Sequence, residues 1–104
     1  MAKSVDAQVM KEKYQEGRDL MASGDYAKAI QAFKTVIKID ETYENGDALY
    51  RLAESFEKNG DTDKAVKYYT KVAEDYGSFY KGRNSARKVE ELKAASEEAE
   101  DTQR

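Results

Sequence analysis

Cysteine and histidine are both absent from this sequence. Without cysteine the chain forms no disulfides and no thiolate metal sites, and without histidine the usual general base and zinc ligand are missing as well. Carboxylates remain, but they lack the ligand spacing and central glycine of a calcium-binding EF-hand loop. No glycine-rich phosphate loop occurs either. We therefore expect a protein that is not an enzyme and that binds no metal and no cofactor.

Long hydrophobic runs are also missing, because nowhere do about 18 consecutive apolar residues occur, as a membrane-spanning helix would need. The N-terminus, Met1-Ala2-Lys3-Ser4, leads into a polar helical pattern instead of a signal peptide. We expect a soluble chain without direct membrane contact, located in the cytoplasm or, if it is cut from a longer protein, outside the cytoplasm. The lack of cysteine does not decide between these compartments.

Charge of a single sign is not in excess, because 38% of the residues are charged while the net charge is only -3. Acids and bases are interleaved, which argues against a nucleic-acid partner. The basic stretch from Lys81 to Lys88 is followed at once by Glu90 and Glu91, so we interpret it as a solvated helix face. Proline is absent and glycine is scarce, whereas Ala, Glu and Lys are abundant, so we expect one all-α domain.

The sequence matches itself at a shift of 36 residues. The identical residues at this shift are Tyr14 and Tyr50, Gly24-Asp25 and Gly60-Asp61, Lys28-Ala29 and Lys64-Ala65, and Val36 and Val72. In each copy, two stripes of apolar residues at helical spacing flank the Gly-Asp pair. Glycine readily ends a helix and aspartate caps the start of the next one, so each copy predicts a helix, a tight turn and a second helix.

Small residues recur inside the predicted helices. Gly17 and Ala53 lie in the first helix of each copy, and Ala29 and Ala65 lie in the second. Glycine inside a helix costs about 1 kcal/mol relative to alanine, so a structural reason must offset it. We expect the two helices of each copy to cross closely at these positions.

Together these residues resemble the pattern of the tetratricopeptide repeat (TPR) family. The pattern comprises Gly17, Leu20, Gly24-Asp25-Tyr26, Ala29 and Phe33 in the first copy, and Ala53, Phe56, Gly60-Asp61, Ala65 and Tyr69 in the second. The resemblance implies a short right-handed α-solenoid of antiparallel helix pairs, with repeat one at about 10–43 and repeat two at about 44–77. The period exceeds the usual ~34 residues, so we expect a longer turn around Asp40-Glu41-Thr42.

A fifth helix is predicted over about 78–93 from residues that recur every three or four positions, namely Phe79, Gly82, Ala86, Val89 and Leu92. It is similar to the first helix of a third repeat and would cap the apolar face of the second repeat. With it, the single TPR domain covers 1–93. We expect residues 94–104 to form a frayed or disordered acidic tail.

The resemblance to the TPR family implies that the chain binds another polypeptide, as a scaffold or adaptor, on the concave surface formed by the first helix of each repeat. In this sequence that surface comprises Lys11, Tyr14, Arg18 and Met21, then Asp47, Tyr50, Arg51, Glu54 and Lys58, and finally Lys81, Asn84, Ser85 and Lys88. Such residues suit an extended peptide that bears carboxylates and an apolar or aromatic side chain. Chaperone-binding members place lysine and asparagine where Tyr14 and Arg18 stand, so a chaperone tail is not the expected partner.

Three alternatives stay open from the sequence. Tyr14 and Tyr50 serve either interhelix packing or recognition, because both lie at the edge of the predicted apolar stripes. Two and a half repeats make a thin core, so the chain is alternatively a homodimerisation module. It is also compatible with a regulatory fragment of a larger bacterial envelope-associated protein, because the run from Asp75 to Ser78 resembles such members of the family.

Overall fold

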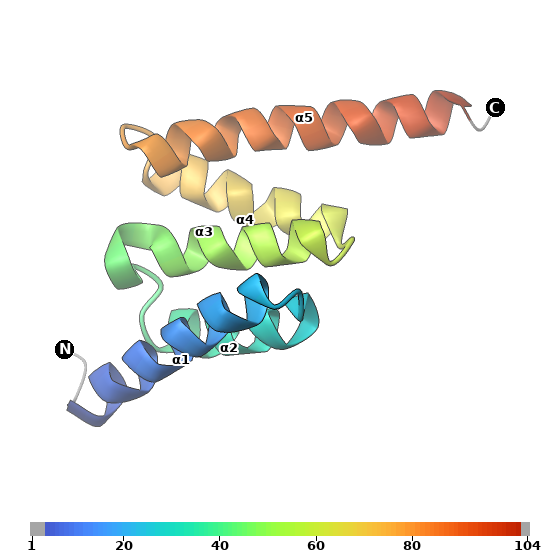
Figure 1. Ribbon diagram of the computed structural model, residues 1–104. Helices are drawn as coiled ribbons and strands as arrows, with labels where there is room; N and C mark the ends of the chain where they lie inside the picture. The colour runs from blue at the N-terminus through green and yellow to red at the C-terminus, as the bar shows by residue number, and fades with distance from the viewer. Residues whose placement is uncertain (1–3, 103–104) are drawn as a thin grey trace.

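The computed structural model describes the backbone of residues 4–102 and the side chains of residues 5–97. Within this part the only regular secondary structure is helix, with short turns between the helices, which confirms the predicted all-α class. The helices are α1 (Ser4–Ala22), α2 (Tyr26–Ile39), α3 (Tyr43–Lys58), α4 (Thr62–Asp75) and α5 (Tyr80–Thr102) (Figure 1).

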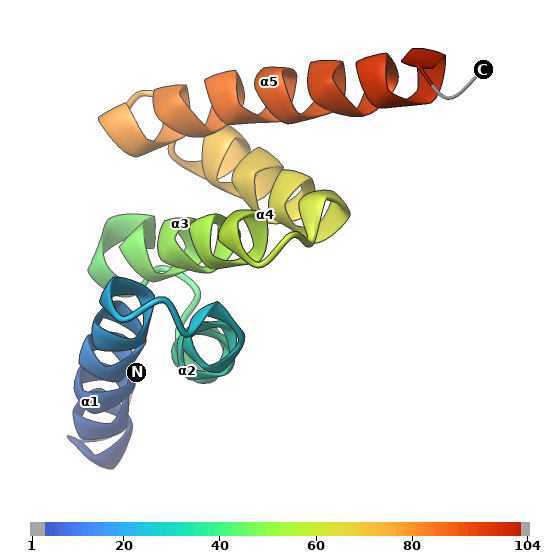
Figure 2. The same cartoon turned by 45° about the vertical axis from the view of Figure 1, so that its right-hand side comes forward.

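The helices form two layers. In Figure 1, α1, α3 and α5 lie on the viewer's side, and α2 and α4 lie behind them. The turned view in Figure 2 separates the two layers, with α2 to the right of α1 and α4 to the right of α3. Each helix packs chiefly on its neighbours along the chain, whereas α1 and α3, and α3 and α5, touch only lightly. The predicted α-solenoid of antiparallel helix pairs is therefore confirmed.

The two Gly-Asp turns join the helices of each pair, as the repeat predicts. Asp25 caps α2, because its Oδ1 accepts a hydrogen bond of 3.3 Å from the backbone N–H of Lys28. Asp61 holds the same position before α4, but its carboxylate accepts a hydrogen bond of 3.0 Å from the Asn59 side chain instead of from the helix. The turn is thus repeated in the backbone, while the capping hydrogen bond is made only in the first copy.

The close helix crossings predicted from the small residues are confirmed. A Cβ atom added to Gly17 would lie 2.7 Å from ring carbons of Phe33, so α1 approaches α2 too closely for any side chain there. Ala29, Ala53 and Ala65 are fully buried. The main core lies between the two layers, and its largest fully buried side chains are Phe33, Leu49, Leu52, Tyr69 and Val72.

The junction between α2 and α3 contains the extra residues of the long period. Thr42 is held in a tight turn, because the carboxylate of Asp40 accepts hydrogen bonds from its N–H at 2.9 Å and from its hydroxyl at 2.7 Å. Glu44, Asn45 and Gly46 then all have positive φ, so the first turn of α3 is left-handed before the regular helix continues. The irregular segment therefore extends beyond the predicted turn at 40–42.

Helix α5 is longer than the sequence predicted. Its capping part packs on α4 through Val89 and Leu92. Instead of fraying from residue 94, the helix runs on to Thr102, and its C-terminal end extends past α4 in both views (Figures 1 and 2). Residues 94–102, for which the sequence predicts a frayed or disordered tail, are helical in the structure, and Ala and Glu, which dominate this segment, are strong helix formers. Residues 103–104 of the expected tail lie outside the described residues.

Across the described residues, no helix is both long enough and apolar enough to cross a membrane.

Gly46 is required by its backbone and by its surroundings, which can be tested against Gly60. Both have positive φ, 86° and 88°, so alanine is strained by about 1–2 kcal/mol at either position. At position 46 the added Cβ would also lie 2.5 Å from the ring of Tyr76, whereas nothing lies within 4 Å at position 60. We expect Gly46→Ala to lower the free energy of unfolding by about 1–3 kcal/mol more than Gly60→Ala. Urea denaturation measures both, and equal losses would contradict the close packing of Tyr76 on this turn.

Candidate functional site

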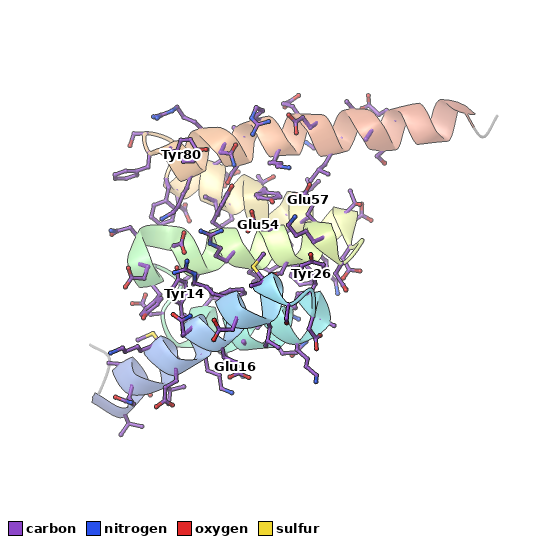
Figure 3. The ribbon with its side chains drawn as sticks, viewed as in Figure 1. Tyr14, Glu16, Tyr26, Glu54, Glu57 and Tyr80 are labelled. Carbon is purple, nitrogen blue, oxygen red and sulfur yellow. The ribbon has the colours of Figure 1, made fainter. Side chains whose placement is uncertain are left out.

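The helices of the front layer, α1, α3 and α5, share one surface, which we call the three-helix face. Figure 3 shows it with Tyr14 on α1, Glu54 and Glu57 on α3, and Tyr80 at the start of α5. The residues of the three-helix face are Lys11, Tyr14, Arg18, Met21, Asp47, Tyr50, Arg51, Glu54, Glu57, Lys58, Tyr80, Lys81, Asn84 and Lys88. Most of them are residues that the sequence predicts for the binding surface.

Asp47 is the group that connects the three helices of this face. Its carboxylate accepts a hydrogen bond from the hydroxyl of Tyr14 on α1. It also pairs with Lys81 of α5 at 3.1 Å and with Arg51, one turn further along α3, at 3.4 Å. The side chain is nearly covered by these partners, since Asp47 is only 5% exposed. The expectation of an accessible acid at this position is therefore wrong.

The charge of Asp47 is stabilised by its partners. Burial disfavours the ionised carboxylate, but the hydrogen bonds from Tyr14 and Lys81 and the positive charges of Arg51 and Lys81 outweigh burial and lower the pKa of Asp47. The same arrangement acts on the phenol, because burial and the hydrogen bond to the Asp47 carboxylate raise the pKa of Tyr14 to about 12. Around neutral pH the pair therefore consists of a carboxylate and a protonated phenol.

Tyr50 is a packing residue rather than an accessible one. It is 9% exposed, and its ring meets that of Tyr69 edge to face at a centroid distance of 5.9 Å. Its hydroxyl accepts a hydrogen bond from the side-chain amide of Asn84 on α5. Tyr14 likewise packs against Phe33 and Tyr43 at centroid distances of 6.0 and 5.3 Å. Of the two alternatives that the sequence leaves open, interhelix packing thus accounts for both tyrosine rings, and Tyr50, which the sequence also places on the binding surface, is nearly covered.

Glu57, which the sequence analysis missed, makes a second bridge between helices. Its carboxylate accepts a hydrogen bond of 2.7 Å from the Tyr69 hydroxyl on α4 and pairs with Lys88 of α5 at 3.1 Å. Helical spacing could have identified Glu57, because it lies three residues after Glu54 and so on the same side of the helix. Ser85, expected on the surface, is fully buried, and its hydroxyl has no hydrogen-bond partner within the described residues.

A shallow hollow of about 260 Å³ opens between α1 and α3. Arg18, Met21 and Ala22 line it from α1, and Arg51 and Glu54 line it from α3. The Arg51 guanidinium pairs with Glu54 at 3.1 Å. Arg18 is exposed, and its guanidinium carbon lies 5.8 Å from the centroid of the Tyr14 ring. None of the ion pairs formed by side chains 5–97 includes Arg18.

The other predicted cations lie away from the hollow. Lys11 is exposed along the flank of α1, where it lines a separate open depression with Gln8 and Gln15. Lys58 is exposed at the end of α3. In all, the three-helix face carries six cations (Lys11, Arg18, Arg51, Lys58, Lys81 and Lys88) and three acids (Asp47, Glu54 and Glu57), so it is net positive on a net negative chain.

The arrangement is suited to binding and orienting a ligand. In the part of the chain with described side chains, no group of three or more acidic, histidine or cysteine residues is placed to hold a metal ion. The charged groups are used instead in bridges between helices, which leaves Arg18 and the hollow beside it open to a partner.

Comparison with known proteins identifies the fold. The sequence model of the tetratricopeptide repeat family matches residues 14–78, which is more than half of the chain. The chain belongs to the tetratricopeptide repeat family. TPR chains form a non-catalytic fold for protein–protein interaction, as the sequence pattern indicates. No solved structure matches the chain significantly.

Three curated relatives share the repeats. The Photosystem I assembly protein Ycf3 of Prochlorococcus marinus strain SARG is 34% identical over 62 residues, which are 59% of this chain and 36% of the relative. The protein of the same name from strain MIT 9211 is 32% identical over 60 residues (57% and 35%), and that from Synechococcus sp. strain WH7803 is 29% identical over 63 residues (60% and 36%). The TPR chain therefore matches about a third of the length of these relatives.

The contribution of Asp47 to the TPR fold depends on pH. Because its pKa is lower in the folded than in the unfolded chain, its ionised form stabilises the fold above the ordinary pKa of about 4, and this stabilisation is lost as the pH falls further. We expect Asp47→Asn to lower the free energy of unfolding by about 1–3 kcal/mol at neutral pH, and the difference from wild type to shrink in acid.

Urea denaturation across this pH range measures the effect. Asp75→Asn, at an exposed acid on α4, controls for the change in net charge. A difference between Asp47→Asn and wild type that persists unchanged in acid would contradict the role of the ionised carboxylate.

Proposed function

We propose that this TPR chain is a scaffold or adaptor that binds an acidic, extended segment of another polypeptide across the three-helix face. The observation that carries the proposal is Arg18, an exposed guanidinium without an acidic partner in the described part of the chain, at the edge of the hollow between α1 and α3. A guanidinium so placed can donate two parallel hydrogen bonds to one carboxylate.

The surroundings of Arg18 favour a peptide ligand over a small ion. The hollow also offers the thioether side chain of Met21 for apolar contact and the carboxylate of Glu54 as an acceptor for a backbone N–H. The excess of cations over the whole face would attract an acidic segment and speed its association. Arg51 and Lys81 are already paired with acids of the chain. Arg18 is therefore the cation most available to a carboxylate of the ligand.

The relatives support a polypeptide as the ligand. All three relatives described above are named as assembly proteins for photosystem I, and assembly brings a protein into contact with other proteins. The match covers only about a third of their length, so the proposal takes from them the class of partner and not its identity.

Arg18→Glu tests the proposal. A peptide selected on the wild-type chain from a phage-displayed random library is synthesised, and its affinity is measured by fluorescence anisotropy. We expect enrichment of acidic residues in the selected peptides and a loss of affinity of about tenfold or more in Arg18→Glu, because an attraction is replaced by a repulsion. The loss should shrink at high salt, where exposed charges are screened.

Lys67→Glu is the matched control, because Lys67 is an exposed cation on α4, in the layer away from the three-helix face. It changes the net charge by the same amount and should leave the affinity unchanged. Thermal unfolding of both variants verifies that each remains folded. Equal affinities of Arg18→Glu and Lys67→Glu would refute binding at the three-helix face.

A further inference from the structure

Tyr80 is an aromatic side chain that the fold does not use. It is 73% exposed, and among side chains 5–97 only Val5 and Phe79 are comparably large, apolar and exposed. The other tyrosines of the three-helix face, Tyr14 and Tyr50, pack their rings against aromatic residues of the rear helices. An exposed aromatic ring in a chain with so few exposed apolar groups marks a contact surface.

The geometry of α5 places Tyr80 on the side that faces α3. Tyr80, Asn84 and Lys88 follow one another at intervals of four residues, so they share one side of the helix. Asn84 contacts Tyr50 and Lys88 contacts Glu57, and both of these partners belong to α3. Tyr80 therefore begins the stripe that borders the three-helix face, as its label at the start of α5 in Figure 3 shows.

The first turn of α5 is fixed before any ligand arrives. Lys81 is held by the buried Asp47, and Gly82 fits so closely against the backbone that an added Cβ would lie 1.9 Å from the carbonyl oxygen of Tyr76. An aromatic ring on a fixed helix end loses little conformational freedom on binding, which favours its use as an anchor.

We propose that Tyr80 anchors an apolar or aromatic side chain of the same acidic segment whose carboxylate pairs with Arg18. The inference rests on the proposed function and adds a second recognition point to it. The segment crosses α3 between the two points. With packed helices spaced about 10 Å apart, the path from α1 to α5 is at least about 20 Å, which about six extended residues span. The ligand thus carries its acidic and apolar residues at least about six positions apart.

The charges near Tyr80 favour a polypeptide over an anionic membrane surface. Four cations lie close to it in the sequence, but Lys81 pairs with Asp47, Arg87 pairs with Glu91 at 2.7 Å, and Lys88 pairs with Glu57 at 3.1 Å. The fourth, Arg83, donates a hydrogen bond of 2.9 Å to the carbonyl of Ser78. Binding to acidic lipids relies on several available cations around the aromatic group, and here most of them are already neutralised.

Tyr80→Ser tests the inference with the selected peptide and with a second peptide in which the apolar residue is replaced by serine. We expect Tyr80→Ser to weaken the first peptide about tenfold at both low and high salt, since the lost contact is apolar. The serine-substituted peptide should bind the variant and the wild type equally. Tyr80→Phe, which keeps the ring, should stay within about twofold of wild type.

Val5→Ser is the matched control, because Val5 is 72% exposed but lies in the first turn of α1, away from Arg18. It should not change the affinity. If Arg18→Glu abolishes binding while Tyr80→Ser binds like wild type, the Tyr80 anchor is overturned and the proposed function stands. If neither variant loses affinity, both are overturned.

Sedimentation equilibrium without peptide completes the test. A monomer that stays monomeric in Tyr80→Ser is the expected result. A wild-type dimer that Tyr80→Ser dissociates would assign the exposed ring to contact with a second copy of this chain, and it would overturn the peptide anchor.

Discussion

The carboxylate of Asp47 connects the helices that form the three-helix face. The helices α1, α3 and α5 touch one another only lightly through their backbones, since each packs mainly on a helix of the rear layer. The bonds from Tyr14 and Lys81 to Asp47 therefore reinforce the contacts between helices that otherwise touch only lightly. A buried carboxylate with three partners stabilises the fold only when all three are in place, because an unpaired buried charge is strongly destabilising. The relative position of α1, α3 and α5 is thereby restricted to arrangements in which the three bonds form together.

The part of the fold that the sequence predicts is the part determined by local chemistry. Gly24 and Gly60 have positive φ and end helices, as glycine commonly does, so the turns could be predicted from the sequence. Gly17 is unfavourable inside a helix unless another helix crosses closely there, so the crossing could be predicted as well. The left-handed turn at Glu44 and Asn45 was not predicted, because Glu44 gives no signal for positive φ, although Asn45 and Gly46 are residue types that adopt it readily. The turn packs through Gly46 against the ring of Tyr76, a contact between residues far apart in the sequence.

The candidate site shows the same division. The residues that the TPR resemblance implies do share one face of α1, α3 and α5 in the structure, but the sequence could not tell which of them remain accessible. Asp47 and Tyr50 are covered because Lys81 and Asn84 reach them from α5, and this depends on how α5 is placed by the rear layer. Arg51 has an acidic partner in Glu54, whereas Arg18, in the first repeat, has none in the described part of the chain. Such contacts between side chains decide which of them are accessible, so the two arginines could not be distinguished from the sequence.

In the proposed mode of binding, stability and recognition are carried by different residues of one surface. The groups that tie the helices together, Asp47, Tyr50 and Glu57, have their hydrogen bonds completed within the chain and offer little to a ligand. Arg18 and Tyr80 are exposed and take no part in these bridges. We therefore expect changes at these two positions to alter what the face binds without removing the bonds that shape it. This separation matters for a repeat chain with a thin core, because its free energy of unfolding is small. Substitutions that change the partner need not lower that free energy further.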